Sequence, residues 1–76
     1  MAEAQQWMKS VFSDMIAEVG WNPDTQELLV KFKKNGKTAA YKGFDEGTAE
    51  ELSRAPSVGQ MFLSDIKPFG QDFRYV

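Results

Sequence analysis

Apolar and polar side chains alternate most regularly between residues 27 and 42. The segment ELLVKF (27–32) has the period of two that a half-buried β-strand produces. Asn35-Gly36 follows it, and this dipeptide is the strongest short signal for a hairpin turn. A second segment then continues to Lys42, so the stretch predicts a β-hairpin centred on Asn35-Gly36.

A two-residue turn at Asn35-Gly36 fixes the register of this hairpin, because Phe32 then pairs with Ala39 and Lys31 with Ala40. The inner face consists of Leu28, Val30, Phe32, Ala39 and Tyr41. The outer face consists of Leu29, Lys31, Lys33, Thr38, Ala40 and Lys42. The apolar set falls on one side, as expected for a strand pair with one buried face.

The chain before the hairpin predicts one further strand, from about Ile16 to Trp21. It ends at Asn22-Pro23-Asp24-Thr25, a turn signal in which proline presets φ and the Asn and Asp side chains bond locally to the backbone. The segment DFRYV (72–76) alternates and adds a possible fourth strand with Phe73 and Tyr75 inward.

Two helix starts follow the hairpin. Thr48 and Glu51 have the spacing of a capping box, although Asp45 could cap one turn earlier. Ser57 begins a second helix, whose apolar stripe runs to about Ile66.

These elements predict an α+β fold: an antiparallel sheet of three or four strands, arranged as a meander around Asn35-Gly36, with two short helices packed on one face. With 76 residues the chain has room for one domain. We expect residues 11–76 to form that domain and residues 1–10 to be an N-terminal extension with frayed structure.

The composition argues against most enzyme classes. The chain has no cysteine and no histidine, so neither Ser13 nor Ser57 has the usual general base. The acidic pairs Asp45-Glu46 and Glu50-Glu51 suit the first turn of a helix better than acid–base or Mg²⁺ chemistry. We therefore expect a protein that is not an enzyme, with no metal, no cofactor and no small-molecule substrate.

No apolar run is long enough to span a membrane, and the segment MAEAQQWMKSVF does not have the pattern of a secretory signal. We expect a cytoplasmic protein without a membrane partner.

Charge is distributed unevenly in this chain of net charge −2. The hairpin holds five lysines and no acid: Lys31, Lys33, Lys34, Lys37 and Lys42. A basic face suits an RNA ligand or an acidic protein partner. The predicted outer face offers no aromatic ring for stacking, however, and lysines also keep a hairpin soluble and prevent edge-to-edge pairing. Both interpretations are open at the level of sequence.

Four apolar residues are candidates for protein–protein contact. Trp7 and Met8 precede the predicted domain, and Leu29 and Ala40 lie on its outer face between the lysines. Exposed tryptophan is a common anchor at interfaces, so this strip could bind an acidic partner or a second copy of the chain as a homodimer.

Three blocks of the sequence resemble the KTSC domain, a small domain named for the C-terminus of some lysyl-tRNA synthetases and also found alone in bacteria and phages. They are SDMIAEVGW (13–21), ELLVKFKKNG (27–36) and APSVGQMFLSDIK (55–67). The resemblance covers about residues 11–75. Ala39 departs from it, because the family's pattern has a tyrosine there, and Phe44-Asp45 replaces the usual Val-Pro.

The resemblance implies the fold above and suggests RNA binding through the synthetase association, a suggestion that Ala39 weakens. The expected function is a small non-enzymatic binding module of a bacterial or phage accessory type, most simply for protein–protein interaction. RNA binding through the lysine-rich outer face of residues 31–42 is the alternative.

Overall fold

The structure, a computed structural model, describes residues 6–68, 70 and 72–76. Its strands are β1 (Trp7–Ser10), β2 (Ile16–Asn22), β3 (Glu27–Phe32), β4 (Thr38–Tyr41) and β5 (Phe73–Tyr75). Its helices are α1 (Glu46–Ser53) and α2 (Val58–Met61), and α2 continues into a π-helical segment, η1 (Phe62–Ile66).

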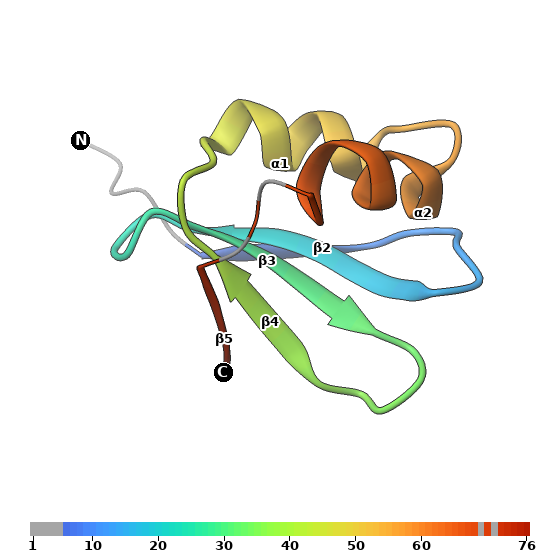
Figure 1. Cartoon of the computed structure of the whole chain (residues 1–76), viewed down its shortest axis with the longest axis horizontal. Helices are drawn as coiled ribbons and strands as arrows, with labels where there is room; N and C mark the ends of the chain where they lie inside the picture. Colours follow the sequence, from blue (N-terminus) through green and yellow to red (C-terminus); the bar gives the residue numbers. More distant parts are fainter. Residues whose placement is uncertain (1–5, 69, 71) are drawn as a thin grey trace.

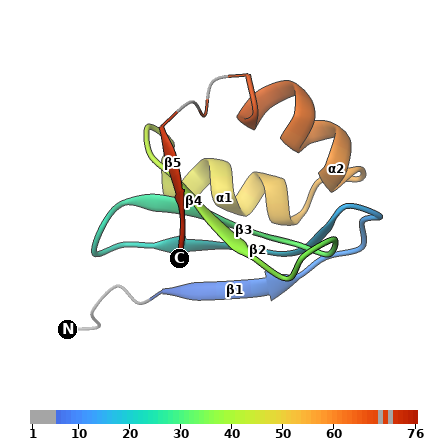
Figure 2. The ribbon, with the colours of Figure 1, turned by 60° about the horizontal axis from the view of Figure 1, so that its bottom comes forward.

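The strands form one antiparallel sheet in the order β1-β2-β3-β4-β5. Both helices lie on one face of this sheet and leave the other face uncovered (Figures 1 and 2). The predicted α+β class and the two helices on one face are confirmed. The sheet of the described residues has five strands instead of three or four, because both ends of the chain contribute an edge strand.

The N-terminal edge strand corrects the prediction that residues 1–10 form a frayed extension. Residues 7–10 pair with β2, and Met8 lies opposite Gly20. A side chain at Gly20 could not fit, because its Cβ would meet the Trp7 carbonyl oxygen and Met8 Sδ. The missing side chain at Gly20 therefore lets β1 lie flat against β2. Residues 1–5 lie outside the described part of the chain.

The hairpin has a different register from the predicted one. Val30, not Phe32, pairs with Ala39, and the Phe32 N–H donates to the Lys37 carbonyl at 2.9 Å. The turn thus contains four residues, 33–36, and the Gly36 N–H closes it on the Phe32 carbonyl at 3.0 Å. Gly36 has φ +69°, but Asn35 is not among the residues with positive φ, whereas the predicted type I′ turn needs both.

The register error is two residues, an even number, so it leaves the paired residues of both strands on their predicted faces. Leu28, Val30, Ala39 and Tyr41 are buried under the helices as expected. Three buried residues of α2 and η1, Val58, Phe62 and Ile66, complete the predicted stripe. The core therefore lies between the inner face of the sheet and the two helices.

The helix starts are close to the predicted ones. Asp45 caps α1, and its Oδ1 accepts hydrogen bonds from the Thr48 backbone N–H at 2.8 Å and the Thr48 hydroxyl at 2.9 Å. These bonds hold the pKa of Asp45 below its ordinary value. Ser57 occupies the N-cap position of α2, but its side chain makes no capping hydrogen bond.

Candidate functional site

A continuous set of aromatic rings lies on the inner face of the sheet beside η1. Phe62 contacts both Phe32 and Tyr41 edge to face, with ring centroids 5.5 and 5.8 Å apart. Phe73 stacks on Tyr41 at 5.1 Å with an interplanar angle of 25°, and Tyr75 meets Phe73 edge to face at 5.7 Å. The rings pass from the buried core to the surface, since Phe73 is 46% and Tyr75 is 55% exposed.

These rings line two adjoining hollows with volumes of about 580 and 390 Å³. Both hollows include Met15, Phe32 and Tyr75, so they form one open depression. We call this depression the aromatic groove, and define it by Met15, Phe32, Tyr41, Phe62, Leu63, Phe73 and Tyr75. It is bounded by η1, the β3–β4 turn and β5.

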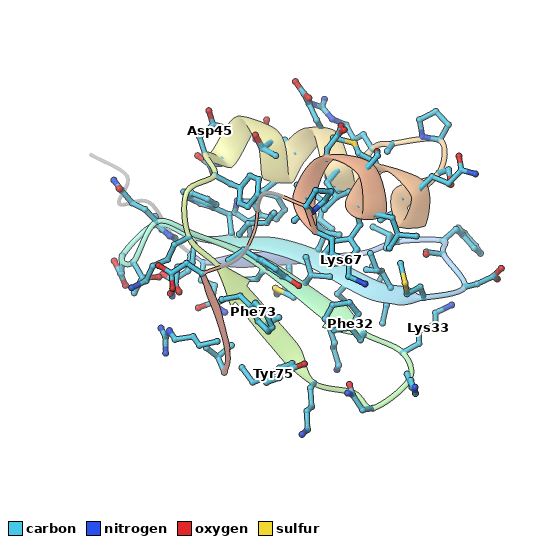
Figure 3. All side chains as sticks on the ribbon, viewed as in Figure 1. Phe32, Lys33, Asp45, Lys67, Phe73 and Tyr75 are labelled. Carbon is cyan, nitrogen blue, oxygen red and sulfur yellow. The ribbon has the colours of Figure 1, made fainter. Side chains whose placement is uncertain are left out.

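Lysines surround the aromatic groove. Lys33 and Lys34 line its end at the hairpin turn, and Lys67 lines the side next to η1. Lys37 reaches over the Tyr75 ring, with Nζ 5.4 Å from the ring centroid. Figure 3 shows Phe32, Phe73 and Tyr75 on the open part of the sheet, with Lys67 extending toward them from the helical layer.

The charged side chains around the groove are mostly positive. Within the described part of the chain, the ion pairs do not include Lys33, Lys34, Lys37 or Lys67. Asp14 is the one carboxylate among the lining residues. The groove therefore offers an apolar floor with positive charge around it, a combination that favours a ligand carrying both apolar and negative groups.

Gly70 brings the chain after η1 close to the floor of the groove. A Cβ at this position would lie 2.5 Å from Tyr41 Cδ1 and 2.9 Å from the Ile66 carbonyl oxygen. Burial is the main cause of a raised pKa for the Tyr41 phenol, and the nearby Tyr75 adds to it. Tyr41 is thus a neutral wall of the groove at physiological pH.

An ion pair on the opposite face of the sheet ties β5 in place. Arg74 donates from Nη2 to Glu27 Oε1 at 2.9 Å and from Nε to Oε2 at 3.3 Å. The Glu27 side chain is only 1% exposed, and the bonds from Arg74 lower its pKa. Because Arg74 lies between Phe73 and Tyr75, the pair fixes the strand that carries the two exposed rings.

The structure divides the five predicted lysines between the two faces. Lys31 is on the outer face, where it lies 3.8 Å from Glu18, and Lys42 is close enough to Glu27 to lower its pKa. Lys33 was expected on the outer face as well, but it belongs to the four-residue turn and lines the groove. The basic residues and the aromatic rings therefore come together on the face that the sequence pattern assigns to the core.

The predicted apolar strip on the outer face is not available for contact. Leu29 is 2% and Ala40 is 0% exposed. They lie in one cross-strand row with Met8, Gly20 and Arg74. Met8 of β1 and Arg74 of β5 supply long side chains at the two ends of this row. Leu29 and Ala40 are therefore not exposed, whereas the predicted contact strip requires exposed residues.

Trp7 is also an element of the fold instead of a free anchor. It packs against the core cluster and lies opposite Trp21. Its indole Nε1–H donates to Glu46 Oε2 at 2.9 Å, which joins β1 to the start of α1. Met8 is half-buried on the outer face.

The serine and glycine of the KTSC-like blocks have structural explanations. The Ser13 hydroxyl oxygen accepts hydrogen bonds from the backbone N–H groups of Met15 and Ile16, both at 3.2 Å. A Cβ at Gly59 would lie 3.2 Å from that same oxygen. These residues hold the β1–β2 loop against α2, and they show no arrangement of nucleophile and base.

Among the described residues 6–68, 70 and 72–76, no group of three or more acidic side chains is placed to hold a metal ion. None of the helices there has the length and apolar character needed to cross a bilayer.

The KTSC domain family model matches residues 12–69. A crystal structure of a KTSC domain protein from Yersinia pestis superposes with a TM-score of 0.74 at 28% sequence identity, covering 93% of this chain and 94% of that one. No curated protein matches the chain. The family match includes β2, β3, β4 and both helices, and it ends before β5, which carries Phe73 and Tyr75.

Proposed function

The chain belongs to the KTSC domain family, and we propose that it is a small non-enzymatic protein-interaction module of a bacterial or phage accessory type, acting in the cytoplasm. Its binding site is the aromatic groove, and its partner is an acidic segment of another protein. One observation carries this proposal: exposed aromatic rings and unpaired lysines lie together in an open depression.

The chemistry of the groove defines the partner. Phe73, Tyr75 and Leu63 are each about half exposed, so an apolar side chain placed among them would be removed from water. Lys33, Lys37 and Lys67 stand around this floor and favour carboxylates beside the apolar groups. A segment that combines aromatic or aliphatic residues with Asp and Glu matches both features.

Single-stranded RNA is the second candidate, because stacking rings with a basic rim are also the features of a single-strand binder. The ring arrangement favours protein over RNA. Phe73 already stacks on Tyr41, and Lys37 lies over the Tyr75 ring, so one face of each ring is already occupied before a base could stack on it. The net charge of −2 further weakens attraction to a phosphate backbone.

A direct test exposes the full chain to two probes in parallel: a random-peptide display library and a random-sequence single-stranded RNA. We expect enrichment of peptides that contain acidic and aromatic residues, and weak RNA binding. RNA binding whose log K falls with log salt at a slope of about −2, as three lysine–phosphate contacts predict, would favour the second candidate. Failure of both probes to bind would overturn the proposal.

Charge-reversal variants locate the site. Lys33→Glu combined with Lys67→Glu should abolish peptide binding, because both residues line the groove. Lys9→Glu is the matched control: Lys9 is exposed on β1, at the opposite edge of the sheet. Lys31→Glu tests the outer face. If Lys31→Glu lost peptide binding and the Lys33→Glu, Lys67→Glu variant kept it, the groove would not be the binding site.

A further inference from the structure

We propose that the partner segment binds as an extended strand added to the open edge of β5. This inference rests on the proposed function and specifies the conformation of the partner. In this mode the backbone of the partner bonds to Phe73 and Tyr75, and alternate side chains enter the aromatic groove.

The backbone of β5 is arranged for such an addition. The Lys42 N–H donates to the Asp72 carbonyl at 3.1 Å, and the Val76 N–H donates to the Thr38 carbonyl at 2.8 Å. Because hydrogen-bonded pairs alternate along an antiparallel ladder, the pair between them, Ala40 and Arg74, is also hydrogen-bonded. The N–H and C=O groups of Phe73 and Tyr75 therefore point away from β4, toward the open edge.

The same two residues supply the exposed rings of the groove. Side chains alternate along a strand, so Phe73 and Tyr75 project to the groove face while Arg74 projects to the outer face and bonds to Glu27. An added strand would continue this alternation. Every second side chain of the partner would lie beside the rings of Phe73 and Tyr75, which places acidic residues of the partner within reach of the groove lysines.

β5 is a short edge strand of three residues, but it contains no lysine, proline or bulge that would prevent strand addition. All three residues of β5 are exposed, Val76 after them is 62% exposed, and the pairing of β5 with β4 shows no bulge. Arg74, the charged residue of β5, is bonded to Glu27 on the outer face. At the other edge of the sheet, β1 carries the exposed Lys9, and an edge lysine discourages pairing.

The pattern of the enriched peptides gives the first test. Strand addition predicts that acidic and aromatic residues recur with a period of two along the selected sequences. A spacing of three and four, which places side chains on one face of a helix, would overturn the inference and leave the proposed function standing. Absence of any enriched peptide would overturn both.

Two variants at one position give the second test, with an enriched peptide as the probe. Tyr75→Ala removes the ring but keeps the outward N–H, whereas Tyr75→Pro removes both. Proline is tolerated where an edge N–H faces outward, so both variants should show the same thermal midpoint. We expect Tyr75→Pro to bind the peptide about fivefold more weakly than Tyr75→Ala, the effect of one lost hydrogen bond. Equal affinities would contradict strand addition while the groove remained the binding site.

If Tyr75→Pro unfolds, backbone N-methylation of the peptide replaces it. Two peptides are compared, one methylated at the odd-numbered residues and one at the even-numbered residues. One of them should lose binding and the other should keep it, because only one of the two sets of peptide N–H groups faces β5. Equal effects in the two peptides would overturn the inference.

Discussion

Arg74 on β5 and Glu27 on β3 are joined by two hydrogen bonds that pass over the intervening strand β4. Glu27 is the one charged residue that is fully buried within the described chain. The pair lies on the outer face, whereas the rings of the neighbouring residues Phe73 and Tyr75 lie on the groove face. One contact on one side of the sheet thus positions the binding surface on the other side.

Removal of Arg74 should therefore reduce stability and loosen β5. Arg74→Gln leaves the Glu27 carboxylate buried without its partner, which is a strongly unfavourable arrangement. We expect a thermal midpoint several degrees lower and faster amide exchange at Arg74 and Val76. Arg54→Gln is the matched control, because Arg54 and Glu50 are both more than half exposed and their ion pair contributes little. Equal midpoints for the two variants would show that the Glu27–Arg74 pair does not hold β5.

The same pair should make stability depend on acid. Arg74 holds the pKa of Glu27 below its ordinary value of 4.5 in the folded protein. The stabilisation is therefore complete above pH 4.5 and is lost as the pH falls through the folded-state pKa. In urea unfolding at stepped pH, the wild type should lose stability below pH 4.5 more steeply than Glu27→Gln. The pKa of Asp45 is also lowered, so both proteins should keep some dependence of stability on pH. Identical dependence in the wild type and in Glu27→Gln would contradict the prediction.

Gly20 should be intolerant of a side chain. Gly20→Ala places a methyl group against the Trp7 carbonyl and Met8 Sδ, so β1 must move and the free energy of unfolding should fall by about 2 kcal/mol. Gly47→Ala is the same substitution in α1, where the nearest atom to the new Cβ is 3.5 Å away. It should raise the free energy of unfolding by about 0.5–1 kcal/mol. Chemical denaturation of both variants measures these two changes in the free energy of unfolding. Changes of the same sign would contradict the close packing of β1 against Gly20.

Gly70 should be needed for the shape of the groove. Gly70→Ala would push a methyl group into Tyr41, and Tyr41 supports Phe73 by stacking. We expect weaker binding of the enriched peptide than in the wild type at a temperature where both are folded. Unchanged affinity would show that the contact between Tyr41 and Phe73 does not shape the binding surface.

Much of the fold is predictable from local signals in the sequence. The period of two in residues 27–32 and the Asn35-Gly36 dipeptide identify the hairpin. The cap signals at Thr48 or Asp45 and at Ser57 identify both helices, and the structure selects Asp45 as the first cap. The turn length is not predictable from Asn35-Gly36 alone, because Asn35 binds the Lys37 N–H through its side chain at 3.0 Å and does not need positive φ. The resulting shift of two residues preserves the faces.

The candidate site is harder to predict, because it depends on contacts between distant segments. The alternation at Phe73 and Tyr75 predicts two rings on one face. Only the pairing of β5 with β4 shows that β5 is an edge strand and that its two rings lie beside Phe32 and Lys67. Likewise, nothing near Trp7 in the sequence indicates its hydrogen bond to Glu46, 39 residues away. Long-range pairing of both edge strands is the information that local patterns lack.

The claim that the aromatic groove is the binding surface is tested most directly by NMR. The full chain, labelled with 15N, is titrated with an enriched peptide, and amide shifts are mapped onto the structure. The account predicts the largest changes at Phe32, Lys33, Lys67, Phe73 and Tyr75, with little change at Met8 and Lys31. Largest changes at Met8 and Lys31 on the outer face, or changes spread evenly over both faces, would contradict it.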